Sequence, residues 1–114
     1  MSYLVTPFEV TSKALPGPVR VRFVHLFPGI ATRHSDTMDC VFLADGRRVI
    51  VAISCSDLTR LREREHRPLS DQQLADLAAL LLRRTLEQGN DPTQSELFLG
   101  GDQLIALARE LRYL

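Results

Sequence analysis

The sequence has no tryptophan, a single lysine and no long apolar run, and each absence narrows what the protein can be. No stretch of 18 apolar residues occurs, so we expect no membrane-spanning helix. The first ten residues lack a basic start and a long apolar core, so we expect no signal peptide. Cysteine is scarce too, and we expect the only two, Cys40 and Cys55, to be reduced, buried thiols in a cytoplasmic protein.

Net charge is also lacking, because 14 basic residues balance 14 acidic ones. This balance argues against a surface tuned as a whole for nucleic acid or an anionic membrane. Apart from Lys13 the basic residues are all arginines, which suit bidentate contacts with carboxylate or phosphate. The same preference for arginine follows from a high-GC genome. The length of 114 residues and the ordinary composition predict one globular domain, residues 1–114.

Alternating apolar and polar residues predict about four strands in the first half of the chain. The expected strands cover residues 3–10, 19–27, 38–43 and 47–54. Pro7 favours an edge position for the first strand, because proline cannot donate to a strand ladder. Asp45 and Gly46 predict a tight hairpin, because a type I′ turn needs positive φ. Within 19–27 we expect Val19, Val21, Phe23 and His25 on one face and Arg20, Arg22, Val24 and Leu26 on the other.

Three helices are expected in the second half. The first begins near Ser54 or Ser56 and ends by Arg67, before a proline. The third follows a glycine pair and is expected to be capped by Asp102. Residues 95–99 fit either a short strand or a turn, and both alternatives stay open.

The second expected helix is the core helix. It begins at Ser70 with a capping box that Gln73 completes, and it ends at Gly89. Its broad apolar arc consists of Leu74, Leu77, Ala78, Leu81, Leu82 and Thr85. Strands first and helices after predict an α+β fold, in which an antiparallel sheet of about four strands is packed by three helices.

Both faces of the expected sheet are apolar, although one helix layer covers only one face. The second face carries Val24, Leu26, Val41, Leu43, Ile50 and Ala52. We therefore expect the third helix, the N-terminal segment or another chain to cover it. A homodimer is the simplest form of the last alternative, since large exposed apolar patches are rare on monomers.

No catalytic, metal or cofactor motif is present. Cys55 lies at an expected helix start, where the dipole favours a thiolate, but no motif places a base beside it. An enzyme site assembled from Cys55, His34 and Asp36 is therefore the least favoured alternative. No short spacing typical of zinc ligands occurs, and we expect no metal. The glycine pair before Asp102 resembles an anion site, but the aspartate opposes a phosphate there, and we expect no cofactor.

The strongest surface feature is an arginine stripe on the first expected helix. Arg60, Arg64 and Arg67 are spaced by four and three residues, so they share one side of a helix. We expect them to bind an acidic protein partner, because arginine is enriched at interface hot spots. One alternative is a solvated helix face without a partner, since Glu63 can neutralise part of the stripe. Another is a nucleic-acid-associated regulator that uses this stripe together with Arg20 and Arg22. No aromatic residues interleave the stripe to stack on bases, which disfavours that alternative.

The hairpin that ends in Ala52, Ile53 and Ser54 before a helix resembles segments of short bacterial proteins, but this likeness involves no chemical residue. The sequence therefore predicts a small bacterial-type module that acts by binding a protein and is not an enzyme.

Overall fold

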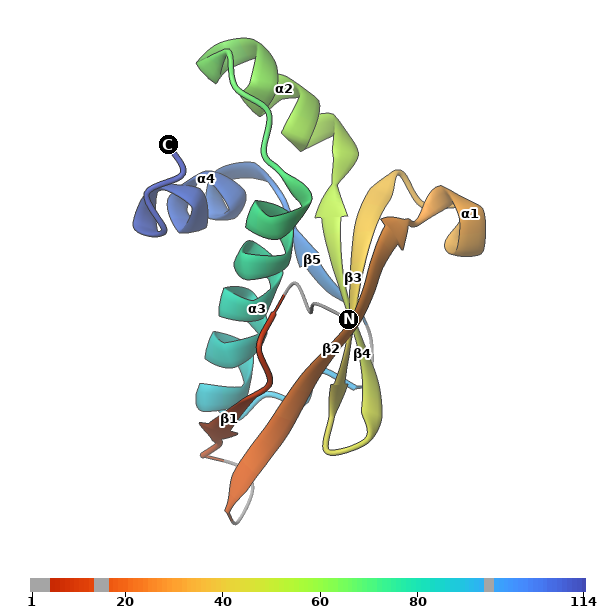
Figure 1. Cartoon of the computed structure of the whole chain (residues 1–114), viewed down its shortest axis with the longest axis vertical. Coiled ribbons are helices and arrows are strands. Elements are labelled where there is room, and N and C mark those ends of the chain that lie inside the picture. Colours follow the sequence, from red (N-terminus) through yellow and green to blue (C-terminus); the bar gives the residue numbers. More distant parts are fainter. Residues whose placement is uncertain (1–4, 14–16, 94–95) are drawn as a thin grey trace.

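In the computed structural model, residues 5–13, 17–93 and 96–114 are described, and they form an α+β fold (Figure 1). The elements are β1 (Phe8–Thr11), β2 (Pro18–Pro28), α1 (Ile30–Arg33), β3 (Thr37–Ala44), β4 (Arg47–Ser54), α2 (Cys55–Glu65), α3 (Asp71–Glu87), β5 (Leu97–Leu99) and α4 (Gly101–Glu110). The first expected strand began at residue 3, and its residues 3 and 4 lie outside the described ranges. The one-turn helix α1 was not expected.

The sheet has five strands in the order β1-β2-β3-β4-β5. The first four pair antiparallel, as predicted, and β1 lies at an edge. The prediction of a four-stranded, wholly antiparallel sheet is wrong, because β5 pairs parallel with β4. Residues 55–96, which contain α2 and α3, connect these two strands, as a parallel pair requires. The Asp45-Gly46 turn joins β3 and β4, and both residues have positive φ.

A β-bulge at Val24 reverses part of the predicted facing of β2. The register pairs Phe23 with Phe42, His25 with Val41 and Leu26 with Cys40. One extra residue therefore shifts the alternation, so His25 joins the outer face and Leu26 joins the core face. Both assignments are the opposite of what strict alternation predicted.

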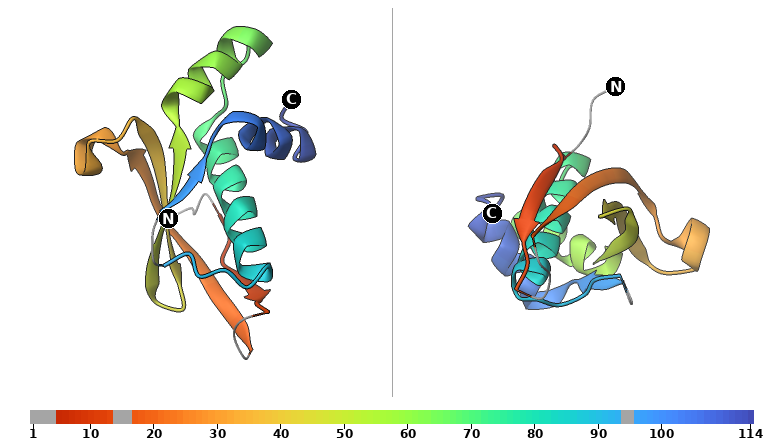
Figure 2. Two further views of the ribbon diagram at one scale, coloured as in Figure 1. Left: turned by 180° about the vertical axis from the view of Figure 1, so that it is seen from behind. Right: turned by 90° about the horizontal axis from the view of Figure 1, so that it is seen from below.

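The helix α3 crosses one face of the sheet and supplies much of the core (Figures 1 and 2). Its buried residues are Leu74, Ala75, Leu77, Ala78, Leu81, Leu82 and Leu86. They pack against sheet residues such as Val21, Phe23, Cys40, Phe42, Val49, Val51 and Ile53. The prediction that this helix is the core helix is confirmed. Its capping box is formed as predicted, because Ser70 and Gln73 each accept a hydrogen bond from the other's backbone amide.

The helix α4 lies beside α3 and is joined to it by polar contacts (Figure 2). Arg84 of α3 pairs with Glu110 of α4 through both carboxylate oxygens. The Tyr113 hydroxyl donates to the Asp76 carboxylate at 2.7 Å. Burial and this carboxylate raise the pKa of Tyr113 to about 12. These contacts place α4 on the core side, so it does not cover the second face of the sheet.

The N-terminus of α4 corrects another prediction. Asp102 does not cap the helix, because Gly100 holds the N-cap position and Asp102 lies in the first turn. The Gly101 amide donates to the Asp57 carboxylate of α2 at 2.8 Å. A Cβ on Gly100 would lie 2.5 Å from the same carboxylate, which explains the glycine. Among the described residues, no helix is long and apolar enough to cross a membrane.

Candidate interaction surfaces

The structure brings together two of the three stripe arginines. Arg60 and Arg64 are exposed on α2 and lie along a shallow hollow between α2 and α4. Arg60 pairs with Asp57 at 3.3 Å and Arg64 pairs with Glu65 at 3.9 Å. The helix ends at Glu65, where His66 adopts a left-handed conformation.

Arg67 therefore lies beyond α2, and the helical spacing that placed it beside Arg60 and Arg64 does not apply. Arg67 lines a separate hollow with Leu58, Arg62 and Leu69. The chain turns two residues earlier than the predicted end. No local signal marks that turn apart from Pro68, which disfavours a helical conformation only for the residue before it.

The thiol of Cys55 is placed where it is poorly activated. The backbone amide of Cys55 donates to the Asp36 carbonyl at 3.1 Å. Two of the three residues of the least favoured enzyme site, Cys55 and Asp36, are therefore neighbours. Burial, and then the charge and hydrogen bonding of Asp36, raise the pKa of this thiol above its usual value. The helix start does not compensate for that effect. His34 is exposed at the end of α1. The second thiol, Cys40, is fully buried, and burial raises its pKa to about 12.

At the glycine pair that resembles an anion site, a carboxylate of the protein itself occupies the helix start. Asp57 accepts the Gly101 amide, so a carboxylate occupies the position that a phosphate would take at this helix start. Within the described ranges, no group of three or more histidine, cysteine, aspartate or glutamate residues is placed to hold a metal ion.

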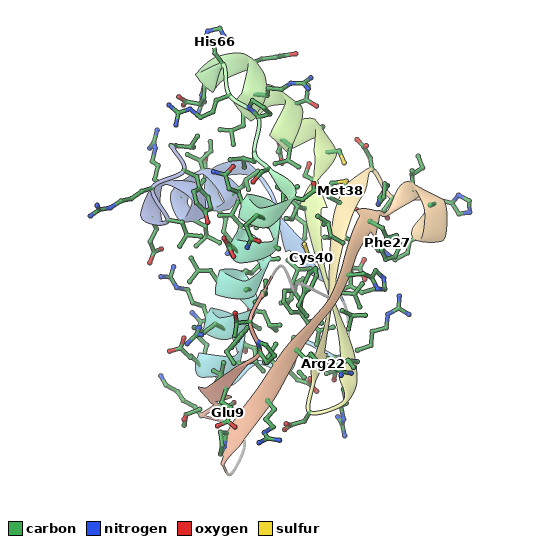
Figure 3. The ribbon with its side chains drawn as sticks, viewed as in Figure 1. Glu9, Arg22, Phe27, Met38, Cys40 and His66 are labelled. Carbon is green, nitrogen blue, oxygen red and sulfur yellow. The ribbon has the colours of Figure 1, made fainter. Side chains whose placement is uncertain are left out.

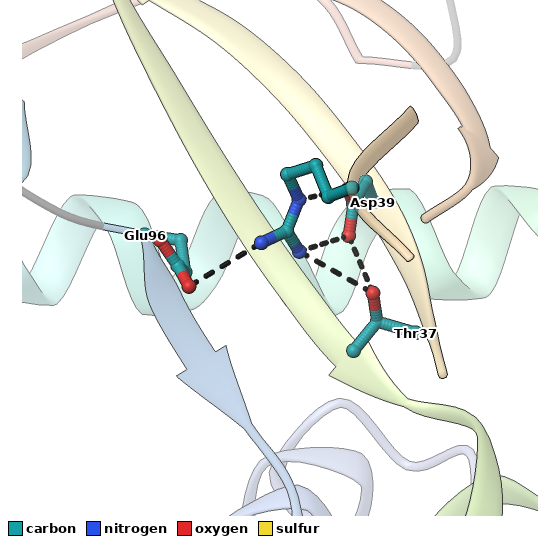
Figure 4. A network of polar contacts seen from close by, with 4 residues as sticks. Thr37, Asp39 and Glu96 are labelled. Carbon is teal, nitrogen blue, oxygen red and sulfur yellow. Dashed lines mark hydrogen bonds and ion pairs between the residues drawn. The ribbon is translucent and has the colours of Figure 1, made fainter. Parts of the chain in front are cut away.

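A buried ion pair on the outer face of the sheet was not predicted from the sequence (Figure 4). The Asp39 carboxylate of β3 accepts two hydrogen bonds from Arg33 of α1, at 2.7 and 2.9 Å. The Thr37 hydroxyl donates to the same carboxylate at 2.7 Å. Arg33 also reaches Glu96, just before β5, at 3.3 Å. The network thus ties α1 to the sheet and to the segment that enters β5.

The electrostatics of Asp39 follow from this environment. Burial acts to raise its pKa, since its side chain is only 1% exposed. Hydrogen bonds from Arg33 and Thr37 and the positive charges of Arg33 and Arg48 outweigh burial, so the pKa lies below its ordinary value. Gly29 makes room for the network, because a Cβ there would lie 2.3 Å from the Thr37 hydroxyl.

Two features of the sequence could have indicated this network. The first is an aspartate in the middle of an otherwise apolar strand, since a buried charge needs a partner. The second is Gly29 at the end of β2. Neither identifies Arg33 as the partner, because the helix that carries it is too short to show periodicity.

The outer face gathers the exposed apolar side chains. Of the described residues, three large apolar ones are exposed, namely Val24 (43%), Ile30 (64%) and Phe98 (61%). They lie at the β2 bulge, on α1 and on β5. Figure 3 shows Phe27 on the side of β2 away from α3, whereas Cys40 lies between the sheet and α3. In the described part of the chain, α1 is the one helix on this side of the sheet (Figure 1).

A row of arginine, leucine and arginine crosses this face near the Asp45-Gly46 turn. The register aligns Arg22 of β2, Leu43 of β3 and Arg48 of β4. Leu43 is half-buried, and both arginines are exposed. Neither arginine forms an ion pair with a described residue. Arg22 and Leu43 also line an open hollow of about 620 Å³, together with Phe8, Glu9, Arg20 and Asp45, whereas Arg48 is not among its lining residues.

No family model, curated protein or solved structure matches this chain.

Proposed function

We propose that the protein acts by binding another protein through the outer face of its sheet, as a non-enzymatic cytoplasmic module. The observation that carries this proposal is the position of the exposed residues Val24, Ile30 and Phe98, which lie on β2, α1 and β5 on the side of the sheet away from α3. Exposed apolar groups concentrated on one side are typical of a protein interface. The half-buried Leu43 and Ile50 extend the same surface between them.

The chemistry of Cys55 supports binding over catalysis. A nucleophilic cysteine needs a lowered pKa and an oriented base. Burial and Asp36 act on Cys55 in the opposite direction. The buried carboxylate of Asp39 is held by Arg33 and Thr37 and has the connections of a structural ion pair.

Arg60, Arg64 and Arg67 form a second proposed contact with the partner. All three are exposed, and Arg60 and Arg64 keep only weak ion pairs on the surface of α2. Alanine at all three positions should leave the far-ultraviolet circular dichroism spectrum unchanged and weaken partner binding. Replacement of Phe98 by aspartate should weaken it more, because an apolar anchor is lost. Full binding by the Phe98 variant would refute the assignment of the outer face.

A second copy of the chain is the alternative partner, since a two-fold dimer is the commonest oligomer. Phe98 is 61% exposed, so its burial against a second copy would stabilise the dimer. Light scattering at micromolar concentration tests it directly. A dimer mass that falls to the monomer mass in Phe98→Asp would identify the partner as a copy, and a monomer mass for the unaltered protein would exclude it.

A further inference from the structure

Charge on the outer face distinguishes the two candidate partners. Arg22 and Arg48 are aligned on either side of Leu43 across three neighbouring strands. Strands lie about 4.8 Å apart, so the two arginine backbones are about 10 Å apart. Each side chain is exposed and has no carboxylate partner in the described ranges. The row therefore offers two unpaired positive charges around one apolar residue.

The other charged side chains on this face already have partners within the protein. Arg20 pairs with Glu9 at 3.2 Å, and Arg33 pairs with Asp39 at 2.7 Å. The remaining acidic group of this region, Asp45, accepts the backbone amide of Arg20 at 2.9 Å. Arg22 and Arg48 thus remain without an ion pair beside Leu43, and Arg48 also contributes to the positive field that lowers the pKa of Asp39.

We propose that the partner is a protein segment that carries an apolar side chain between two carboxylates. The apolar side chain would pack on Leu43, which lines the hollow of about 620 Å³ together with Arg22. Glu9 and Asp45 also line this hollow, and both are held by Arg20. The carboxylates would pair with Arg22 and Arg48, for which a planar guanidinium is well shaped. This inference rests on the proposed function, because it names the chemistry of the partner at the same surface.

A second copy of the chain fits this row less well. A second copy would have to supply carboxylates to Arg22 and Arg48, and Glu9, Asp39 and Glu96 of its own outer face are already paired with Arg20 and Arg33. A nucleic acid fits less well too, because a phosphate backbone is bound by a longer run of cationic groups than the two arginines of this row. An acidic protein segment satisfies both the charges and the apolar residue.

The test uses the full chain and a phage-displayed library of random dodecapeptides. After selection on the immobilised protein, the enriched peptides are synthesised with a fluorescent label and measured by fluorescence polarisation. We expect enriched sequences with an apolar residue flanked by aspartate or glutamate, and affinity that falls as salt rises. The double variant Arg22→Glu, Arg48→Glu should bind these peptides at least about tenfold more weakly.

The matched control is Arg47→Glu with Arg109→Glu. It makes the same change in net charge, but Arg47 faces the other side of β4 and Arg109 lies on α4. Binding by this control should stay within about twofold of the unaltered protein, as expected for charges outside an interface. Circular dichroism of both variants checks that the fold is kept.

Three outcomes would overturn the inference. Peptides without acidic residues, whose binding the Arg22 and Arg48 changes leave intact, would reject the acidic partner but keep a protein-binding surface. A dimer that dissociates on Phe98→Asp would assign the face to a second copy. A monomer that selects no peptide would reject both the acidic partner and the proposed function.

Discussion

Arg33 and Asp39 form an ion pair whose two halves should differ in the cost of their removal. The Asp39 side chain is 1% exposed and the Arg33 side chain is 21% exposed. Breaking a buried ion pair on one side costs about 3–5 kcal/mol, because the other charge stays buried. For Arg33→Met we expect about 4–5 kcal/mol, since the Asp39 carboxylate keeps only Thr37 as a hydrogen-bond donor.

Asp39→Asn should cost less, about 2–3 kcal/mol, because charge-assisted hydrogen bonds are lost but little charge is trapped. Arg33 keeps its contact with Glu96 in this variant and is exposed enough to reach water. The chain has no tryptophan, so the assay is urea unfolding followed by far-ultraviolet circular dichroism. Equal costs, or a larger cost for Asp39→Asn, would refute the reasoning.

The two variants also differ in their dependence on pH. In the unaltered protein the pKa of Asp39 is lowered by folding. The ionised carboxylate therefore stabilises the folded state at pH values above the unfolded-state pKa of about 3.9, and this stabilisation is lost as the pH falls through the folded-state pKa. Without Arg33, burial dominates and the folded pKa rises, so the penalty is present at pH 7 and disappears toward about pH 4. The stability gap of Arg33→Met should therefore narrow between pH 7 and pH 4 more than that of Asp39→Asn. A gap independent of pH would contradict this account.

Three further predictions concern other parts of the fold. Leu77→Ala, at a fully buried position of α3, should cost about 2–5 kcal/mol in urea unfolding, and a loss below about 1 kcal/mol would mean that α3 is not the core helix. Gly29→Ala should cost about 1–3 kcal/mol in the same assay, because its methyl group meets Thr37, and unchanged stability would contradict the close approach. The Cys55 thiol should react with iodoacetamide at pH 7 more slowly than a cysteine in an unfolded peptide, and Asp36→Asn should speed the reaction. A slower reaction in the Asp36 variant would show that its charge does not raise the thiol pKa.

Local signals predicted the elements that depend on local physics. The Ser70 capping box, the Asp45-Gly46 turn and the apolar arc of α3 each act within a few residues, and each is found as predicted. The strand at 97–99 was left open because three residues are too few to show alternation, and its pairing with Val51 depends on the whole intervening chain. The periodicity of a sequence reflects only local spacing, so it cannot predict pairing between residues that lie this far apart along the chain.

The candidate surfaces were less predictable for a related reason. The extra residue at Val24 reverses the facing of His25 and Leu26, and a bulge of one residue leaves no mark on composition. The predicted stripe failed at Arg67 because the chain leaves the helix at His66. Arg22 and Arg48 were not linked by the sequence, since only the pairing of both strands with β3 aligns them across Leu43.

The parallel pairing of β5 with β4 has a consequence for the order in which the protein folds. Strands β1 to β4 contact neighbours in sequence, so their pairing closes only short loops and forms early. The pairing of Val51 with Leu97 must wait for α2 and α3, which occupy the connection. Synthesis from the N-terminus delivers the elements in the same order, so we expect β5 and α4 to dock last, on the meander and its α3 layer. The β4 edge therefore stays open until residues 97–99 pair with it.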